Sequence, residues 1–317
     1  MPTSGKKPIQ EITRRCKNHD YRSRRIYLIT LLKSAGAPCF SSITADPGAP
    51  KITPSVELTP TGQTIYDCLD RLCADNRHLS ILRRIAMPDH LHFELFVKER
   101  TEQHLGSIIA AFKASCTAKA NRALFEPGFN DKIAFRKGAK DAFYNYIADN
   151  PRRYLVRKLF PEYFFHRLLI KVNDRLCGLY GNIFLLDNPI KSAIRISRIP
   201  ERTPDYESKK AEWEEVIRAG GVIVSPFINP HEKKYRDEAI ENGNGIILVT
   251  DYLFSDRKKP YKELFEQCAS GRLLIVTTEQ YPEPPRKVDY LHAQELNANA
   301  AMLAQLPPRA CRLIPRR

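Results

Sequence analysis

The stretch HLHFELFV, from His90 to Val97, places the tightest constraint on what this chain can fold into. Successive side chains of a β-strand point to opposite faces. The odd-numbered residues of the stretch are all apolar and would form one continuous face. The other face would carry His90, His92 and Glu94. The alternation therefore predicts a strand that buries one face in a core and presents two imidazoles and a carboxylate on the other.

Further strands and helices are expected on both sides of this stretch. A strand is predicted at 26–32, a helix at 62–76 capped by Thr61, and a second strand at 79–86. An amphipathic helix follows, with an apolar stripe from Leu105 to Cys116. This order is typical of a ferredoxin-like α+β sandwich, an antiparallel sheet with helices on one face.

The second half of the chain has a different pattern. The stretches GGVIVSPF (220–227), GIILVT (245–250) and GRLLIV (271–276) are short, largely apolar runs without alternation, and helical stretches separate them. Such strands are buried on both faces, which predicts a small parallel α/β domain. The resulting division is a basic arm (1–25), the α+β domain (26–165), a hairpin and connector (166–210), the α/β accessory domain (211–280) and a helical basic tail (281–317).

The net charge of +15 is unevenly distributed. Residues 1–160 hold 27 Lys and Arg against 15 Asp and Glu, whereas residues 161–317 hold 24 against 21. A basic first half favours a partner that carries phosphate groups; a solvated basic surface is the alternative. The eight cysteines include no CxxC pair and no apolar run approaches ~18 residues, so a reducing cytoplasm is expected and a membrane span is not.

Two groups of residues suggest chemistry. His90 and His92 are spaced so that both imidazoles can converge on one cation, although two histidines at a domain surface would show the same spacing. Asn150 follows Tyr146 by four residues on one helix face, and Pro151 is expected to end that helix. Tyrosine can attack a phosphodiester beside a metal. Ordinary packing of Tyr146, and an N-cap role for Asn150, remain open.

The order of these motifs resembles that of the HUH single-tyrosine transposases, and among them the REP-associated tyrosine transposases. In that family a Met- or Leu-Pro-x-His-x-His strand precedes a Tyr-x-x-x-Asn-Pro element, and here the two read MPDHLH and YIADNP. FKASCTAKANR resembles the Phe-Lys element of the family at Phe112, and FNDKIAF resembles the segment before its tyrosine helix. The resemblance spans residues 27–157, and the chain continues well beyond the point where small members end.

Carried over by position, the resemblance implies that His90 and His92 hold Mg²⁺ or Mn²⁺, with Asn150 as a further ligand. Tyr146 would be the nucleophile that forms a 5′-phosphotyrosine on single-stranded or hairpin DNA, with Tyr144 as the alternative nucleophile. A homodimer is a further expectation, because relatives are often dimeric. The cations expected to hold DNA are Arg22, Arg24, Arg25, Lys113, Arg152 and Arg153.

Two other functions fit the sequence. The first is a DNA-binding module that keeps this fold without catalysis and serves in regulation or partner recruitment. The second places the activity in the α/β region as a nucleotide-dependent enzyme, although no phosphate loop of the Walker type is present.

Overall fold

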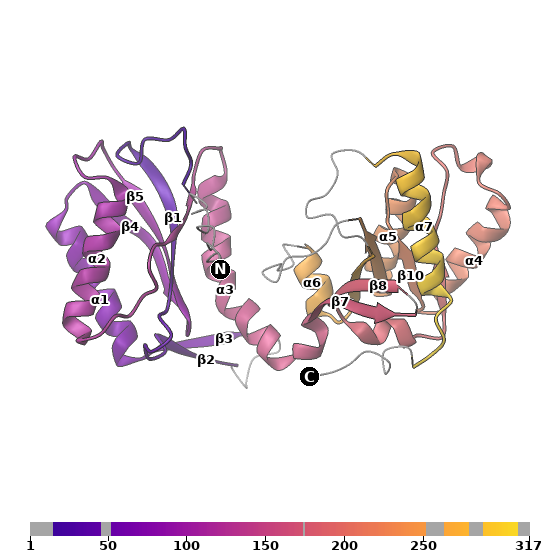
Figure 1. Ribbon diagram of the computed structural model, residues 1–317, viewed down its shortest axis with the longest axis horizontal. Coiled ribbons are helices and arrows are strands. Elements are labelled where there is room, and N and C mark those ends of the chain that lie inside the picture. Colours follow the sequence, from indigo (N-terminus) through magenta and orange to yellow (C-terminus); the bar gives the residue numbers. More distant parts are fainter. Residues whose placement is uncertain (1–14, 46–51, 174, 252–262, 279–287, 310–317) are drawn as a thin grey trace, which may run out of the picture. The chain divides into compact units, whose positions relative to one another are not determined.

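The computed structural model consists of two compact units, Met1–Leu155 and Val156–Arg317 (Figure 1). Each unit has a sheet and a hydrophobic core of its own, and together they give the mixed α+β fold that the sequence predicts. The residues described are 15–45, 52–173, 175–251, 263–278 and 288–309.

The first unit is built on a four-stranded antiparallel sheet in the order β4-β5-β1-β6. The apolar face of β5 is buried as the alternation predicts, with Leu91, Phe93 and Leu95 fully inaccessible. The next two strands along the chain, β2 and β3, pair in a separate antiparallel two-stranded sheet. The strands are β1 Arg25–Leu32, β2 Ser41–Ala45, β3 Pro54–Leu58, β4 Leu79–Ala86, β5 His90–Val97 and β6 Asn130–Ile133.

Helices α1 (Pro60–Asp75) and α2 (Leu105–Ala120) cover the apolar face of this sheet and contribute to one core with it (Figure 1). The N-cap of α1 is Thr59, whose hydroxyl accepts a hydrogen bond from the Gly62 amide, so the expected cap at Thr61 was wrong. The reason is Pro60, because proline is favoured in the first helical position.

Helix α3 (Ala139–Leu159) belongs to the opposite face of the sheet, where Phe143 and Ile147 pack against Leu28 of β1. The helices therefore do not all lie on one face. Helix α3 also runs through Pro151 without ending, contrary to the sequence prediction. The Asn150 side-chain amide donates to the Tyr146 carbonyl at 2.9 Å, which adds a hydrogen bond in the turn that proline weakens.

The second unit contains a six-stranded mixed sheet in the order β7-β8-β12-β11-β10-β9. The four strands from β12 to β9 are parallel, as expected for this region, and the β7-β8 hairpin adds to β12 in antiparallel orientation. The hairpin and the α/β region thus share one sheet. The strands are β7 Phe165–Val172, β8 Arg175–Gly181, β9 Lys191–Ala193, β10 Val222–Ser225, β11 Gly245–Thr250 and β12 Leu273–Thr277.

Helices cover both faces of this second sheet. Residues of α4, α5 and α6 pack in one core on one side, and α7 packs in another core on the other. β9 and a short 3₁₀ turn at 200–202 lie within the segment 166–210, where the sequence predicts a hairpin and a connector. The helices are α4 Tyr206–Arg218, α5 Pro230–Asn242, α6 Glu263–Ala269 and α7 Tyr290–Ala304, with short 3₁₀ turns η1 Pro161–Phe164, η2 Ile183–Asp187 and η3 Pro200–Arg202.

Two observations bear on the environment of the protein. Among the described residues, no helix combines the length and apolar character needed to cross a bilayer. The seven cysteines in the described part of the chain all have free thiols, and four of them are buried.

Candidate functional site

The polar face of β5 lies on the side of the sheet that α3 covers. His90 and His92 are neighbours there, with ring centroids 4.4 Å apart and planes at 75°. His92 pairs with Thr30 of β1 across the antiparallel ladder. It is 3% exposed, whereas His90 is half-buried at the end of the strand. The alternation of the strand thus places both imidazoles side by side, as the sequence predicts.

Each imidazole is oriented by a neighbour through its Nδ1 atom. The Thr30 hydroxyl and His92 Nδ1 are 2.8 Å apart, and an Asp89 carboxylate oxygen lies 2.7 Å from His90 Nδ1. A histidine engaged in this way at Nδ1 binds a metal through Nε2. The Nδ1 atom of each imidazole is thus occupied, and Nε2 is the ring nitrogen of each that could hold a metal.

The protonation state of His92 fits the same role. Burial, followed by the charge of neighbouring His90, lowers the pKa of His92 well below its ordinary value. The imidazole is consequently neutral near pH 7, which is the form that coordinates a metal.

Helix α3 brings Tyr146 to this pair. The Tyr146 ring lies 5.2 Å from the His92 ring, edge to face at 69°. The ammonium of Lys132 on β6 lies 5.3 Å from the centre of the same tyrosine ring. A phenol, two imidazoles and a lysine from three elements of the first unit therefore share one locality.

Tyr144 has different surroundings. It is 42% exposed, and the Arg83 guanidinium carbon lies 3.1 Å from the centre of its ring. Two residues apart on a helix, the two tyrosines point about 200° from one another. Of the two tyrosines, Tyr146 is the one in ring contact with His92.

Asn150 lies one turn after Tyr146 on α3, and its amide nitrogen is occupied by the Tyr146 carbonyl. Its Oδ1 atom remains the coordinating end of the side chain. Within the described residues, no group of three or more His, Cys, Asp or Glu is placed to hold a metal ion. A metal at His90 and His92 would thus need an amide oxygen, water or substrate oxygens to complete its coordination.

Glu94 continues the polar face of β5 beyond the histidines. It is 1% exposed, its Oε1 atom has no hydrogen-bond partner among the described residues, and burial raises the pKa of its carboxyl. The sequence showed this residue on the same face as His90 and His92, but without a role.

The six cations expected to hold DNA fall into two groups. Arg22, Arg24 and Arg25 are exposed around the start of β1. The side chains of the other three are held within the protein. Lys113 donates to two loop carbonyls, including Gly128 at 3.1 Å, and burial lowers its pKa. Arg152 and Arg153 both approach Asp149 on α3, at 2.6 and 3.6 Å.

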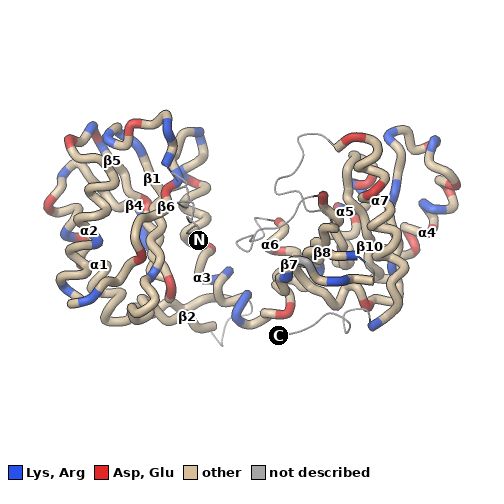
Figure 2. Tube along the Cα trace, in the orientation of Figure 1, with Lys and Arg blue, Asp and Glu red and all other residues tan. Residues whose placement is uncertain are grey.

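The described end of the basic arm is anchored rather than loose. Arg15 forms an ion pair with Asp131, and the Tyr21 hydroxyl donates to the same carboxylate at 3.0 Å. His19 Nε2 lies 2.8 Å from the Tyr27 hydroxyl on β1. Residues 15–25 are thereby tied to the sheet, while the arm before Arg15 lies outside the described residues. Figure 2 shows where the Lys and Arg residues lie along the strands and helices of this unit.

Three residues near the site were missed from the sequence. Asp89 directly precedes His90, and Thr30 interrupts an otherwise apolar strand, so both carried a signal. Lys132 could have been found from strand parity, because it pairs with Leu28 and so shares the face of α3.

The similarity of this chain to known proteins is weak. The sequence matches no family model, and no curated protein is significantly similar to it. One solved structure, a REP-associated tyrosine transposase bound to a REP hairpin, is similar over 42% of this chain and 70% of that chain. The sequence identity is 15% and the TM-score is 0.34. Similarity at this level does not establish a family.

Proposed function

We propose that the first unit is a metal-dependent DNA nickase and strand-transferase of the HUH single-tyrosine type, with Tyr146 as its nucleophile. The observation that carries the proposal is the ring contact of Tyr146 with the buried, neutral His92, itself 4.4 Å from His90. The catalytic domain in this proposal is the part of residues 26–165 that belongs to the first unit; its sheet with α1 and α2 on one face has the arrangement of a ferredoxin-like sandwich, and α3 adds to the other face. The motif order noted in the sequence adds support.

The reaction is a transesterification. The Tyr146 oxygen attacks the phosphorus of a phosphodiester in single-stranded DNA and loses its proton. The bond from phosphorus to the 3′-oxygen breaks, and that oxygen takes up a proton. The products are a 5′-phosphotyrosine and a free 3′-hydroxyl. Because one ester replaces another, a 3′-hydroxyl can reverse the step and join strands without ATP.

His90, His92 and the Asn150 amide oxygen are the proposed holders of a Mg²⁺ or Mn²⁺ ion. Held there, the ion would supply Lewis-acid polarisation of the phosphate and would offset the charge that develops on its oxygens. The residues around the site do the positioning. Thr30 and Asp89 fix the orientation of the imidazoles, and packing of Phe143 and Ile147 against the sheet holds the tyrosine helix over them.

Single-stranded or hairpin DNA is the proposed partner. The exposed cations at the start of β1, namely Arg22, Arg24 and Arg25, are available for phosphates. Lys132 stands beside the tyrosine ring and is exposed, so it is a further candidate for a phosphate contact. Binding through these cations should weaken as the salt concentration is raised. The cations displace counterions from the DNA, and the release of counterions is less favourable when the solution already contains many.

A covalent-capture assay tests the proposal. Purified protein is incubated with labelled single-stranded and hairpin oligonucleotides and Mg²⁺ or Mn²⁺, then separated on a denaturing gel. We expect label to migrate with the protein, to disappear with EDTA and to disappear in Tyr146→Phe. Tyr144→Phe is the matched control and should keep the adduct.

Other outcomes have distinct meanings. An adduct lost in Tyr144→Phe and kept in Tyr146→Phe would refute the assigned nucleophile. Hairpin binding without any adduct, unchanged when His90, His92 and Tyr146 are replaced together, would refute catalysis and leave a DNA-binding module.

A further inference from the structure

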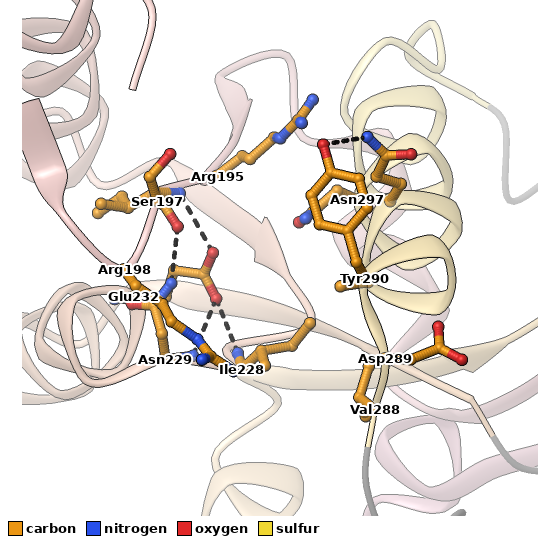
Figure 3. A pocket seen from close by; sticks show the side chains of 13 residues that line it. Arg195, Ser197, Arg198, Ile228, Asn229, Glu232, Val288, Asp289, Tyr290 and Asn297 are labelled. Atoms are coloured by element: carbon orange, nitrogen blue, oxygen red, sulfur yellow. Dashed lines mark hydrogen bonds between the residues drawn. The ribbon is translucent and has the colours of Figure 1, made fainter. Parts of the chain in front are cut away.

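A cavity of about 450 Å³ lies in the second unit, far along the chain from the proposed nuclease residues. It is lined by the segment that follows β9, the turn before α5 and the beginning of α7 (Figure 3). The volume falls in the range of small-molecule sites, roughly 300–1,000 Å³. β9 and β10 are parallel neighbours that end at Ala193 and Ser225, so the cavity lies just past their carboxyl ends. Open α/β sheets bind ligands at this edge.

Two arginines line the cavity, and the charge of Arg195 acts on the buried Glu232 carboxylate beside it. Arg195 and Arg198 are exposed, and neither guanidinium forms a hydrogen bond or ion pair with a described residue. The hydrogen bonds of that carboxylate are made to the main chain and not to either arginine. Glu232 accepts hydrogen bonds from the backbone amides of Ile196 at 3.1 Å and Ile228 at 2.7 Å, so it turns toward the main chain. The arginines are thus available to an anionic ligand, for which guanidinium groups are well suited.

The N-terminus of α5 opens beside the cavity but is already capped. Asn229 Oδ1 accepts from the amides of His231 and Glu232 at 2.9 and 3.1 Å, and Pro230 has no amide proton. The backbone amides therefore do not form an anion cradle of the kind found in phosphate loops. Recognition of an anion here rests on the two arginine side chains.

The opposite wall, from α7, is suited to a planar polar group. The Tyr290 ring is 72% exposed, and its hydroxyl accepts from Gln294 Nε2 at 2.7 Å. Asn297 Oδ1 is buried and has no hydrogen-bond partner among the described residues. A buried acceptor of this kind is favourable only when a donor reaches it. An aromatic surface beside an unsatisfied acceptor fits a nucleobase, which stacks and offers N–H groups.

We propose that this cavity binds a free nucleotide. Its phosphates lie against Arg195 and Arg198, and its base lies between Tyr290 and the Asn297 amide oxygen. The two ends of the cavity then match the two ends of one ligand, the anionic end on the segment after β9 and the heteroaromatic end on α7. This site is independent of the proposed DNA cleavage in the first unit and does not require it.

Equilibrium dialysis of the full chain against each radiolabelled ribonucleoside triphosphate, with and without Mg²⁺, tests the proposal. We expect saturable binding of at least one. The double variant Arg195→Gln/Arg198→Gln should weaken it by roughly tenfold or more, because charge-assisted hydrogen bonds are lost. Arg202→Gln, an exposed arginine in the adjacent η3 turn that does not line the cavity, is the matched control and should bind normally.

The base end is tested separately. Tyr290→Leu and Asn297→Leu should each lower the affinity for the nucleotide. The affinity for pyrophosphate, measured by competition, should stay unchanged. Four results would overturn the proposal: no saturable binding of any triphosphate, binding unaffected by the arginine pair, pyrophosphate competing as well as the nucleotide, or binding of single-stranded oligonucleotides only. Circular dichroism of each variant establishes that folding is retained.

Discussion

The two sheets of this protein keep their polar groups in different places. In the first unit, His92 and Glu94 are buried on the broad face of the sheet, in the middle of β5. In the second unit, the parallel strands β10 and β12 are buried along their whole lengths, and their buried polar residues, Ser225 and Thr277, are the last of each strand.

The difference follows from how each sheet is covered. Helices pack on both faces of the second sheet, so only the strand ends are free to present functional groups. On the first sheet, α3 packs through a small apolar cluster and leaves room for polar residues beside it. Chemistry is therefore expected on a face of the first unit and at an edge of the second.

The largest expected effect is on the face of the first sheet. His90→Ala removes one of the two imidazoles, and we expect metal-dependent adduct formation to fall by roughly a thousandfold or more, because a metal supplies several kcal/mol of charge stabilisation. Gel quantification of the adduct over a Mn²⁺ titration measures this. His78→Ala, on an exposed histidine that contacts Glu99, should retain activity. Equal loss in both variants would contradict a specific metal role.

A polar side chain placed in the middle of the second sheet should have the next largest effect. Ile247→His buries an imidazole in a fully inaccessible position of β11, and we expect it to destabilise that unit by about 3 kcal/mol or more. The single tryptophan, Trp213, is buried in this unit, so its fluorescence during urea unfolding reports the loss. His92→Leu should leave this transition unchanged. A tolerated histidine at position 247 would show that the two sheets do not differ as described.

A smaller effect is expected from the neighbour of His92. Thr30→Val keeps the shape of the side chain and removes the hydroxyl that lies 2.8 Å from Nδ1. Loss of such an outer contact typically costs about 10–100-fold in metal affinity or activity. The measurement is the Mn²⁺ concentration for half-maximal adduct formation. Thr44→Val, on an exposed threonine of β2, is the control; if both variants behave alike, the hydroxyl does not orient the imidazole.

The smallest effect concerns the buried carboxyl of Glu94. Burial raises its pKa, so the folded state holds the proton more tightly than the unfolded chain does. Stability from this group is therefore full below the ordinary pKa of a glutamate and falls as pH rises through the raised value. Glu94→Gln should remove this dependence, so that it stabilises the first unit more at neutral pH than at acidic pH. Calorimetric melting at acidic and neutral pH tests it. An equal change at both values would contradict the sign.

Much of the fold was predictable because local patterns agree with tertiary packing. The alternation in 90–97 and the apolar runs at 245–250 and 271–276 correspond to β5, β11 and β12, and the stripe from Leu105 corresponds to α2. β9 was missed because it has only three residues, too few for any periodicity. Its partner β10 defines it through tertiary pairing.

The residues of the candidate site also differ in whether their proximity could be predicted from the sequence. His90 and His92 meet because strand parity is a local property, visible in the sequence. The proximity of Tyr146 depends on how α3 packs on the sheet, which no local pattern encodes. Pro151 gave a misleading signal, because local preference ends a helix there while packing on both sides, at Ile147 and Leu155, sustains it.

Helix α3 has a practical consequence for anyone who wishes to separate the two halves. The compact units divide between Leu155 and Val156, inside a continuous helix that extends from Ala139 to Leu159. Proteases cut most readily at exposed loop tips, and hydrogen-bonded helical backbone at this junction should resist them. A fragment begun at the junction would start within the last turn of α3, where its first amides lose the carbonyls that they bond in the intact helix. Independent expression of either half should therefore retain all of α3, with the break placed outside it.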